Sequence, residues 1–278
     1  MAVFAELTLQ DFHLDGKVYK YWIQGNSNNP PLVMFYGFTG VAKDFSEVTN
    51  LLKDKYLIVI PEFPGWNGSP RLQASLSLKN YAKFFKQLFN FLGYSKVSIF
   101  GHCLGAVEAI EFTYLYPETV DKLILVSTPY LGSKTEKFHK ILVRLAERSP
   151  KQLRPIFFFW RSRIFGIPFD FYSIKLRNFE KKLDRIKEHI FKQPHEPQDA
   201  VEENWISFIK FDFRKARKIK QMVHLIHGAE DVLINPRQAV KLQTLFPRVS
   251  LDIIPEAGHV PPVETTKELV KLLRRYLD

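Results

Sequence analysis

One cysteine stands where it could act as a nucleophile. Cys103 lies in the turn Gly101-His102-Cys103-Leu104-Gly105, between an apolar run that ends at Phe100 and a helix-like run that starts at Leu104. The flanking glycines leave room for a strained backbone at the cysteine. A strand, a tight turn and a helix in this order place Cys103 at a helix N-terminus, which favours negative charge. Because the thiolate is the nucleophilic form, the pattern predicts a reactive Cys103.

A base and an acid follow later in the chain. Asp231 comes shortly after the apolar run 222–227, and His259 comes shortly after the apolar run 249–254. A histidine beside a thiol can act as its base, and an aspartate can orient that histidine and stabilise its charged form. We therefore predict a Cys103–His259–Asp231 triad, with Glu230 as the neighbouring alternative acid.

Each of these residues also has a structural interpretation. Cys103 could be a small buried residue in an inactive turn, His259 a cap on the final helix, and Asp231 a turn former that binds its own loop amides. His102 is expected to point away from the nucleophile, and His227 to shape the acid loop. Glu108, inside the helix after the turn, is either a solvated or paired helix residue or a polar group near the site.

Short apolar runs alternate with helical patterns along the chain and would position these groups. After a hairpin signal at Asp15-Gly16, apolar runs at 32–36, 56–60, 97–100, 123–127, 222–227 and 249–254 read as buried strands. This alternation predicts an α/β fold with a mostly parallel, doubly wound sheet of about eight strands and helices on both faces. Reactive groups gather at the carboxyl ends of strands in such sheets.

The order Gly-x-Cys-x-Gly, then Asp, then Gly-His resembles the α/β-hydrolase fold family. Further matches are Gly37-Phe38-Thr39-Gly40, Phe63-Pro64-Gly65-Trp66-Asn67-Gly68-Ser69 and Gly228-Ala229-Glu230-Asp231. The resemblance implies an oxyanion hole made by the backbone N–H groups of Phe38 and Leu104.

Two positions depart from the family pattern. The family usually has Ser at position 103, and members with Cys there are similar to dienelactone hydrolases, polyhydroxyalkanoate synthases and certain thioesterases. The common His-Gly before the oxyanion loop is Tyr36-Gly37 here.

The segment 131–218 differs in composition from the rest of the chain. It holds 21 Lys and Arg against 11 Asp and Glu, and 12 of the 25 Phe. We expect it to be a basic, aromatic-rich helical cap inserted after strand 6, with a hydrolase core formed by 1–130 and 219–278. Its charge fits either a lid with a basic outer face or attraction to an acyl-CoA, an acyl carrier protein or an anionic membrane surface. No nucleic-acid partner is expected, because no recognition fold is present.

These observations predict a hydrolase of carboxylic esters, lactones or thioesters that forms an acyl-Cys intermediate on a small acyl substrate. Three alternatives stay open: an acyltransferase or synthase with the same intermediate, a non-catalytic ligand receptor, and a chain in which Cys103 is an introduced replacement for Ser. No cofactor or metal is expected, and a single cysteine excludes an internal disulfide. The absence of a signal-peptide pattern predicts a cytoplasmic protein.

Overall fold

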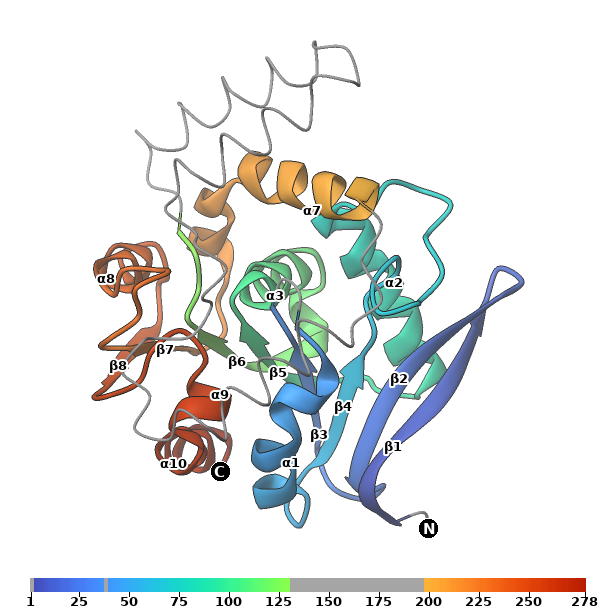
Figure 1. Cartoon of the computed structure of the whole chain (residues 1–278), viewed down its shortest axis with the longest axis horizontal. Coiled ribbons are helices and arrows are strands. Elements are labelled where there is room, and N and C mark those ends of the chain that lie inside the picture. Colours follow the sequence, from blue (N-terminus) through green and yellow to red (C-terminus); the bar gives the residue numbers. More distant parts are fainter. Residues whose placement is uncertain (1–2, 38–39, 131–197) are drawn as a thin grey trace.

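The computed structural model describes residues 3–37, 40–130 and 198–278, and the strands of these ranges form one eight-stranded sheet (Figure 1). Its order is β1-β2-β4-β3-β5-β6-β7-β8. β1 and β2 pair antiparallel, and β2 also runs antiparallel to β4. All later neighbours in this order, from the β4–β3 pair to the β7–β8 pair, are parallel. This confirms the predicted mostly parallel sheet. The strands are β1 Val3–Leu14, β2 Lys17–Asn26, β3 Pro31–Phe35, β4 Leu57–Pro61, β5 Val97–His102, β6 Val120–Val126, β7 Val223–Gly228 and β8 Val249–Ile254.

The central strands are apolar because both of their faces are covered. Every residue of β4 and β7 is buried, as are the last four residues of β3. Full burial of a Val, Leu, Ile or Phe side chain contributes roughly 1.5–3 kcal/mol. The continuous apolar runs therefore hold the sheet in the centre of the molecule, and the chain turns at its carboxyl edge carry the polar residues.

Helices cover both faces of the sheet. α1 and α10 pack together on one face, and α2 packs against α3 on the other (Figure 1). The side chain of Ser77 caps α2 by accepting a hydrogen bond from the Asn80 N–H. The helices are η1 Ala42–Phe45, α1 Ser46–Leu52, α2 Leu78–Phe91, α3 Leu104–Leu115, η2 Pro117–Thr119, α7 Gln198–Lys210, η4 Phe213–Lys218, α8 Arg237–Gln243, α9 Pro261–Glu264 and α10 Thr266–Leu277.

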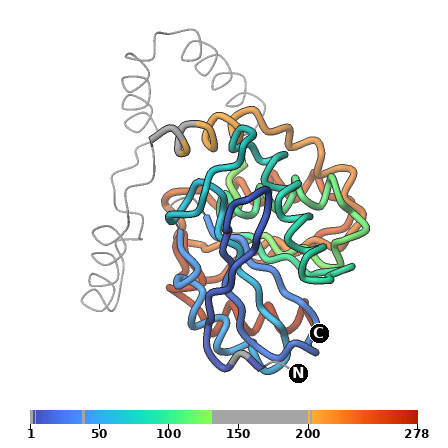
Figure 2. Tube along the Cα trace, turned by 90° about the vertical axis from the view of Figure 1, so that its right-hand side faces the viewer, coloured from blue at the N-terminus to red at the C-terminus, as the bar shows by residue number. Residues whose placement is uncertain are grey.

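The end of the predicted cap packs on the core. α7 crosses the molecule on the side opposite the two chain termini (Figure 2). Arg71 pairs with Glu203 of α7 at 2.7 Å, and the Leu78 N–H donates to Ser207 Oγ at 2.9 Å. Residues 131–197, which make up most of the predicted cap, lie outside the described residues. The cap and the two-part core therefore stay predictions. In the described ranges, no helix has the length and apolar character needed to cross a membrane.

Candidate active site

The turn between β5 and α3 holds Cys103 in a strained backbone conformation. Its φ is 51° and its ψ is −119°, and α3 begins at the next residue. The turn is tight enough that a Cβ on Gly101 would lie 2.6 Å from the Ala106 Cα, and a Cβ on Gly105 would lie 2.5 Å from the Tyr36 carbonyl oxygen. Only glycine fits at both positions. The side chain of Cys103 thus projects, partly exposed, at the start of a helix.

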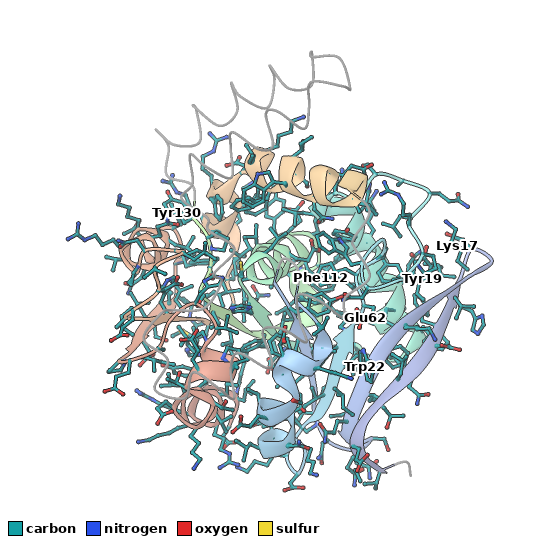
Figure 3. The ribbon with its side chains drawn as sticks, in the orientation of Figure 1. Lys17, Tyr19, Trp22, Glu62, Phe112 and Tyr130 are labelled. Atoms are coloured by element: carbon teal, nitrogen blue, oxygen red, sulfur yellow. The ribbon has the colours of Figure 1, made fainter. Side chains whose placement is uncertain are left out.

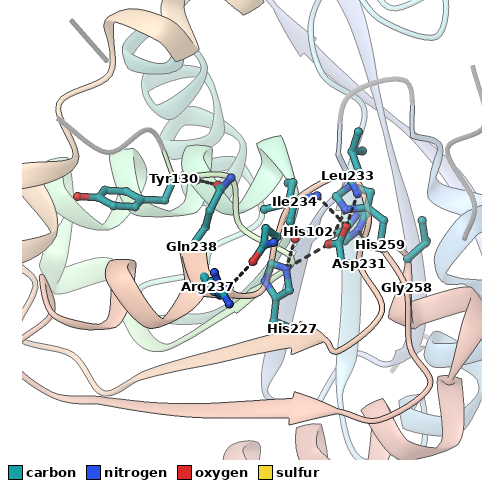
Figure 4. Close-up of polar contacts among 12 residues, drawn as sticks. His102, Tyr130, His227, Asp231, Leu233, Ile234, Arg237, Gln238, Gly258 and His259 are labelled. Carbon is teal, nitrogen blue, oxygen red and sulfur yellow. Dashed lines mark hydrogen bonds and ion pairs between the residues drawn. The ribbon is translucent and has the colours of Figure 1, made fainter. Parts of the chain in front are cut away.

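His259 and Asp231 meet at the same edge of the sheet, beyond β8 and β7. The Nδ1 of His259 donates to Asp231 Oδ2 at 2.9 Å (Figure 4). The other carboxylate oxygen, Oδ1, accepts from the backbone N–H groups of Leu233 at 2.9 Å and Ile234 at 2.8 Å. Burial raises the pKa of Asp231, but the hydrogen bonds from His227 and His259 outweigh it and hold this pKa well below the usual range. Asp231 is therefore an ionised, fixed acceptor.

The ring of His259 is the link between Asp231 and Cys103. Burial alone would lower its pKa, but the charge of Cys103, hydrogen bonds to Asp231 and Cys103, and the charge of Asp231 together raise it to about 10. Because Nδ1 donates to Asp231, Nε2 is the ring nitrogen that is available to the sulfur. An imidazolium beside a sulfur is the arrangement that favours a thiolate.

His227 contacts Asp231, the candidate acid. Its Nε2 lies 2.7 Å from the Ile234 carbonyl oxygen and 3.1 Å from Asp231 Oδ2. A carbonyl can only accept, so Nε2 carries the proton and donates. The loop from Gly228 to Ile234 is thereby closed around the Asp231 carboxylate.

Comparison with known proteins assigns the chain to a family. The family model described as alpha/beta hydrolase fold matches residues 30–265. The chain belongs to the α/β-hydrolase fold family.

Individual relatives of this α/β-hydrolase are distant. An uncharacterized protein of Mycobacterium tuberculosis is 25% identical, with 90% of this chain and 76% of that protein covered. A 2-hydroxy-6-oxononadienedioate/2-hydroxy-6-oxononatrienedioate hydrolase of Escherichia coli is 22% identical, with 87% of this chain and 83% of that protein covered. The enol-lactonase from Burkholderia xenovorans superposes with a TM-score of 0.77 at 15% identity, covering 96% of this chain and 99% of that chain. The structural likeness shows the fold alone.

In this α/β-hydrolase, Tyr36 takes the place before the oxyanion loop. Its hydroxyl donates to Glu62 Oε2 at 2.6 Å and accepts from the Phe63 N–H and from Asn67 Nδ2, each at 3.1 Å. Trp22 Nε1 donates to the other oxygen of Glu62 at 2.7 Å, from β2 to the residue that follows the neighbouring strand β4 (Figure 3). Burial, followed by the charge of Glu62, raises the pKa of Tyr36 well above its usual range, so the phenol keeps its proton.

His102 has a role that sequence reasoning missed. Its Nε2 lies 2.9 Å from the carbonyl oxygen of His259, and the two rings are 5.2 Å apart. Burial, together with the charge of His259, lowers the pKa of His102 to about 3, so the ring is neutral and donates from Nε2. The residue before the candidate nucleophile thus holds the backbone of the candidate base.

A sequence signal existed for the Tyr36–Glu62 contact. Tyr36 directly follows β3 and Glu62 directly follows β4, and these two strands are parallel neighbours. Polar residues that follow adjacent parallel strands lie side by side at the carboxyl edge. No comparable signal existed for His102 and His259, which are 157 residues apart.

The predicted oxyanion donors are described only in part. Leu104 is the first residue of α3, so its N–H belongs to the first turn, where N–H groups have no partner within the helix. Phe38 lies outside the described residues. Among the described residues, no three His, Cys, Asp or Glu side chains are grouped so that they could hold a metal ion.

The expectation that Glu108 is solvated or paired is wrong. Its side chain is completely buried, and neither carboxyl oxygen has a hydrogen-bond partner among the described residues. The reason is that α3 is surrounded: residues 104–113 of this helix are all buried beneath neighbouring elements. Glu108 instead lines a cavity together with Gly37 and Leu104, which matches the other interpretation, a polar group near the candidate site.

Proposed function

We propose that the protein is a hydrolase of carboxylic esters, lactones or thioesters that works through a covalent acyl intermediate on Cys103. The observation that carries this proposal is the chain of contacts from Asp231 through His259 to the sulfur of Cys103. A fixed carboxylate, a protonated imidazole and a thiol at a strained turn form the machinery of nucleophilic acyl chemistry.

The reaction would proceed in two halves. The Cys103 thiolate attacks the carbonyl carbon, and the oxyanion that forms is held by the Leu104 N–H and by the predicted donor Phe38. His259 gives its proton to the departing oxygen or sulfur as the carbon–heteroatom bond breaks, which leaves a thioester on Cys103. In the second half, water attacks this thioester while His259 takes one of its protons. The acid leaves and the thiolate–imidazolium pair is restored.

The relatives support hydrolytic chemistry as the class of reaction. The Escherichia coli relative carries the name of a hydrolase, and a structural neighbour is an enol-lactonase. Neither identity is high enough to transfer a substrate. The proposal therefore names the bond that is cleaved and not the acyl group.

Acyl transfer is the second candidate, and the sulfur atom favours it. A thioester is attacked well by amines, thiols and activated alcohols, so transfer competes with hydrolysis better than it does from a serine ester. The acyl donor would be an acyl-CoA or an acyl carrier protein. Either would be attracted by the basic segment 131–218, which carries the net positive charge of the chain.

Intact-protein mass spectrometry tests the proposal. The protein is mixed with a panel of short and medium acyl esters, lactones and acyl-CoAs, and quenched in acid. We expect one added acyl group per chain, absent in Cys103→Ala and His259→Ala. The matched control is His13→Ala, which changes an exposed histidine of β1 and should leave acylation unchanged. Absence of an adduct across the panel overturns the proposal, and ligand binding without an adduct would point to a receptor.

The same adduct separates the two reactions. Decay of the acyl-enzyme is followed in buffer alone and with an added amine, thiol or alcohol acceptor. Decay that is independent of the acceptor identifies a hydrolase. Decay that rises in proportion to acceptor, with the acyl group recovered on it, identifies a transferase.

A further inference from the structure

Two buried glutamates on α3 differ in whether their carboxylate has a direct partner. Glu111 is ion-paired with Lys215 of η4 at 2.5 Å. Glu108, one turn earlier, is fully buried, and within residues 3–37, 40–130 and 198–278 neither of its oxygens has a hydrogen-bond partner. A buried polar group without a partner costs stability, and native proteins satisfy nearly all such groups. A partner for Glu108 that arrives with a ligand would explain why it is placed there.

Glu108 lines a small cavity behind the candidate nucleophile. The cavity measures about 20 Å³, and the wall includes Gly37, Phe63, Trp66, Leu104 and Asn204. Gly37 packs directly on the nucleophile, since a Cβ added to it would lie 2.8 Å from the Cys103 Cβ. Leu104 is the predicted oxyanion donor. The cavity therefore shares a wall with the site of acyl transfer.

Asn204 does not supply the missing partner. Its amide nitrogen donates to Tyr81 Oη at 2.7 Å and to the Ala200 carbonyl oxygen at 3.2 Å. Both amide hydrogens are thus already used. The carboxyl of Glu108 therefore has no hydrogen-bond partner among the described residues, and it lies in the wall of a cavity that has room for about one water-sized group.

We propose that Glu108 is a specificity-determining residue whose carboxyl group hydrogen-bonds a keto or hydroxyl oxygen on the acyl chain of the substrate. Oxygenated acyl groups, rather than plain alkyl chains, are then the preferred substrate class. This inference rests on the proposed acyl chemistry at Cys103, because it assumes that the acyl chain enters from the sulfur.

The surroundings make Glu108 a neutral donor. Burial, with the negative charge of Glu111 added, raises its pKa well above that of an ordinary glutamate, and Lys215 only partly opposes this. A cationic ligand is disfavoured, because the aromatic walls would strip water from an ion pair. A protonated carboxyl offers one O–H to an acceptor oxygen, which matches a ketone or an alcohol.

The spacing along α3 defines where the oxygen should lie. Glu108 is five residues after Cys103, which corresponds to about 7.5 Å of rise along a helix. The oxygen must therefore sit several bonds from the reacting carbonyl, near the middle of a short acyl chain. An oxygen next to the carbonyl would stay beside the sulfur.

Calorimetric binding to the full chain with Cys103→Ala tests this without turnover. The probes are pentanoate, its keto analogues with the oxygen on the β, γ or δ carbon, and γ-aminopentanoate. We expect at least one keto acid to bind about tenfold or more tightly than pentanoate, as one hydrogen bond to a buried acid would give. Adding Glu108→Gln, which keeps a donor, should preserve this ratio. Adding Glu108→Met should reduce it to about one, whereas the control Glu6→Gln, which changes an exposed glutamate of β1, should leave it unchanged.

Three outcomes overturn the inference: equal binding of pentanoate and every keto acid, a ratio that Glu108→Met does not change, or tightest binding of the amino acid. The first and second would leave a bound water as the occupant of the cavity. The test is independent of the proposed function, because it uses a chain without the sulfur. If no acyl adduct ever forms on Cys103 but the keto preference disappears with Glu108→Met, the catalytic proposal fails and the recognition site remains.

Discussion

The ring of His102 donates a hydrogen bond from Nε2 to the carbonyl oxygen of His259, over 2.9 Å. The residue before the candidate nucleophile thereby fixes the loop that carries the candidate base. Two turns at the ends of β5 and β8 are joined by a neutral donor and a backbone acceptor, inside the protein, where such a bond is not exchanged with water.

Replacing His102 should slow acylation more than it weakens binding. His102→Leu removes the donor and lets the His259 backbone shift, so we expect kcat/KM to fall by about tenfold to a hundredfold, mostly in kcat. His102→Gln can still donate and should recover most of the rate. Steady-state kinetics on one ester of the panel measures both. Equal rates for the Leu variant and the wild type would show that the bond has no part in positioning the base.

The raised pKa of His259 predicts how Cys103 reacts with iodoacetamide. Because the imidazolium persists to about pH 10, it should speed alkylation of the sulfur beside it. His259→Gln removes the cation and should alkylate more slowly than the wild type at pH 7. Mass spectrometry of quenched samples gives the rates. Equal rates for the two proteins at pH 7 would rule out the imidazolium.

The Tyr36 hydroxyl should matter for both stability and catalysis. Tyr36→Phe leaves Glu62, Asn67 and the Phe63 N–H each short of one partner, so the free energy of unfolding should fall by about 1–3 kcal/mol. Because Tyr36 precedes the oxyanion loop, kcat should fall as well. The matched control is Tyr56→Phe, whose hydroxyl also donates to a carboxylate, that of Asp278, far from the site. The control should keep wild-type kcat, and loss of activity in both variants would remove the link to the loop.

The burial of Glu108 predicts a pH dependence of stability with a definite sign. An ordinary glutamate has a pKa near 4.5, and the folded state holds the pKa of Glu108 well above it. Above pH 4.5, unfolding therefore releases a proton, and the wild type loses stability as pH rises toward the folded pKa. Glu108→Gln lacks this contribution, so its stability relative to the wild type should grow by about 1.4 kcal/mol per pH unit.

Urea unfolding at intervals between about pH 5 and pH 7 measures this slope. Glu6→Gln, which changes an exposed glutamate of β1, serves as the control and should run parallel to the wild type. A Glu108→Gln curve that also runs parallel to the wild type would mean that Glu108 is ionised in the folded protein.

The sequence was sufficient for the fold because the fold depends on local patterns. Apolar runs gave the parallel strands, the Asp15-Gly16 turn gave the hairpin, and the two glycines around Cys103 gave the tight turn. The family assignment followed from the order of these motifs and was confirmed over residues 30–265. The grouping of Asp231 and His259 also follows from their positions after β7 and β8.

What the sequence could not supply depends on packing between distant elements. Glu108 and Glu111 are equivalent by pattern, yet Lys215 of η4 forms a direct ion pair with Glu111, and Glu108 has no hydrogen-bond partner in the described part of the chain. His102 was expected to point away from the nucleophile, and its contact with the His259 backbone depends on how two loops close. The catalytic roles, the cap and the donor at Phe38 remain predictions.

The direct pairing of β6 with β7 has an evolutionary consequence. Leu123–Val126 lies beside Val223–Ile226, so the chain leaves the sheet and returns to the adjacent position almost a hundred residues later. Each doubling of such an excursion costs only about 0.6 kcal/mol in closure entropy. The sheet can therefore accept exchanged or resized intervening segments while the geometry of the candidate triad stays as it is. Evolution can thus change which molecules reach Cys103 without changing the residues at the carboxyl edge of the sheet.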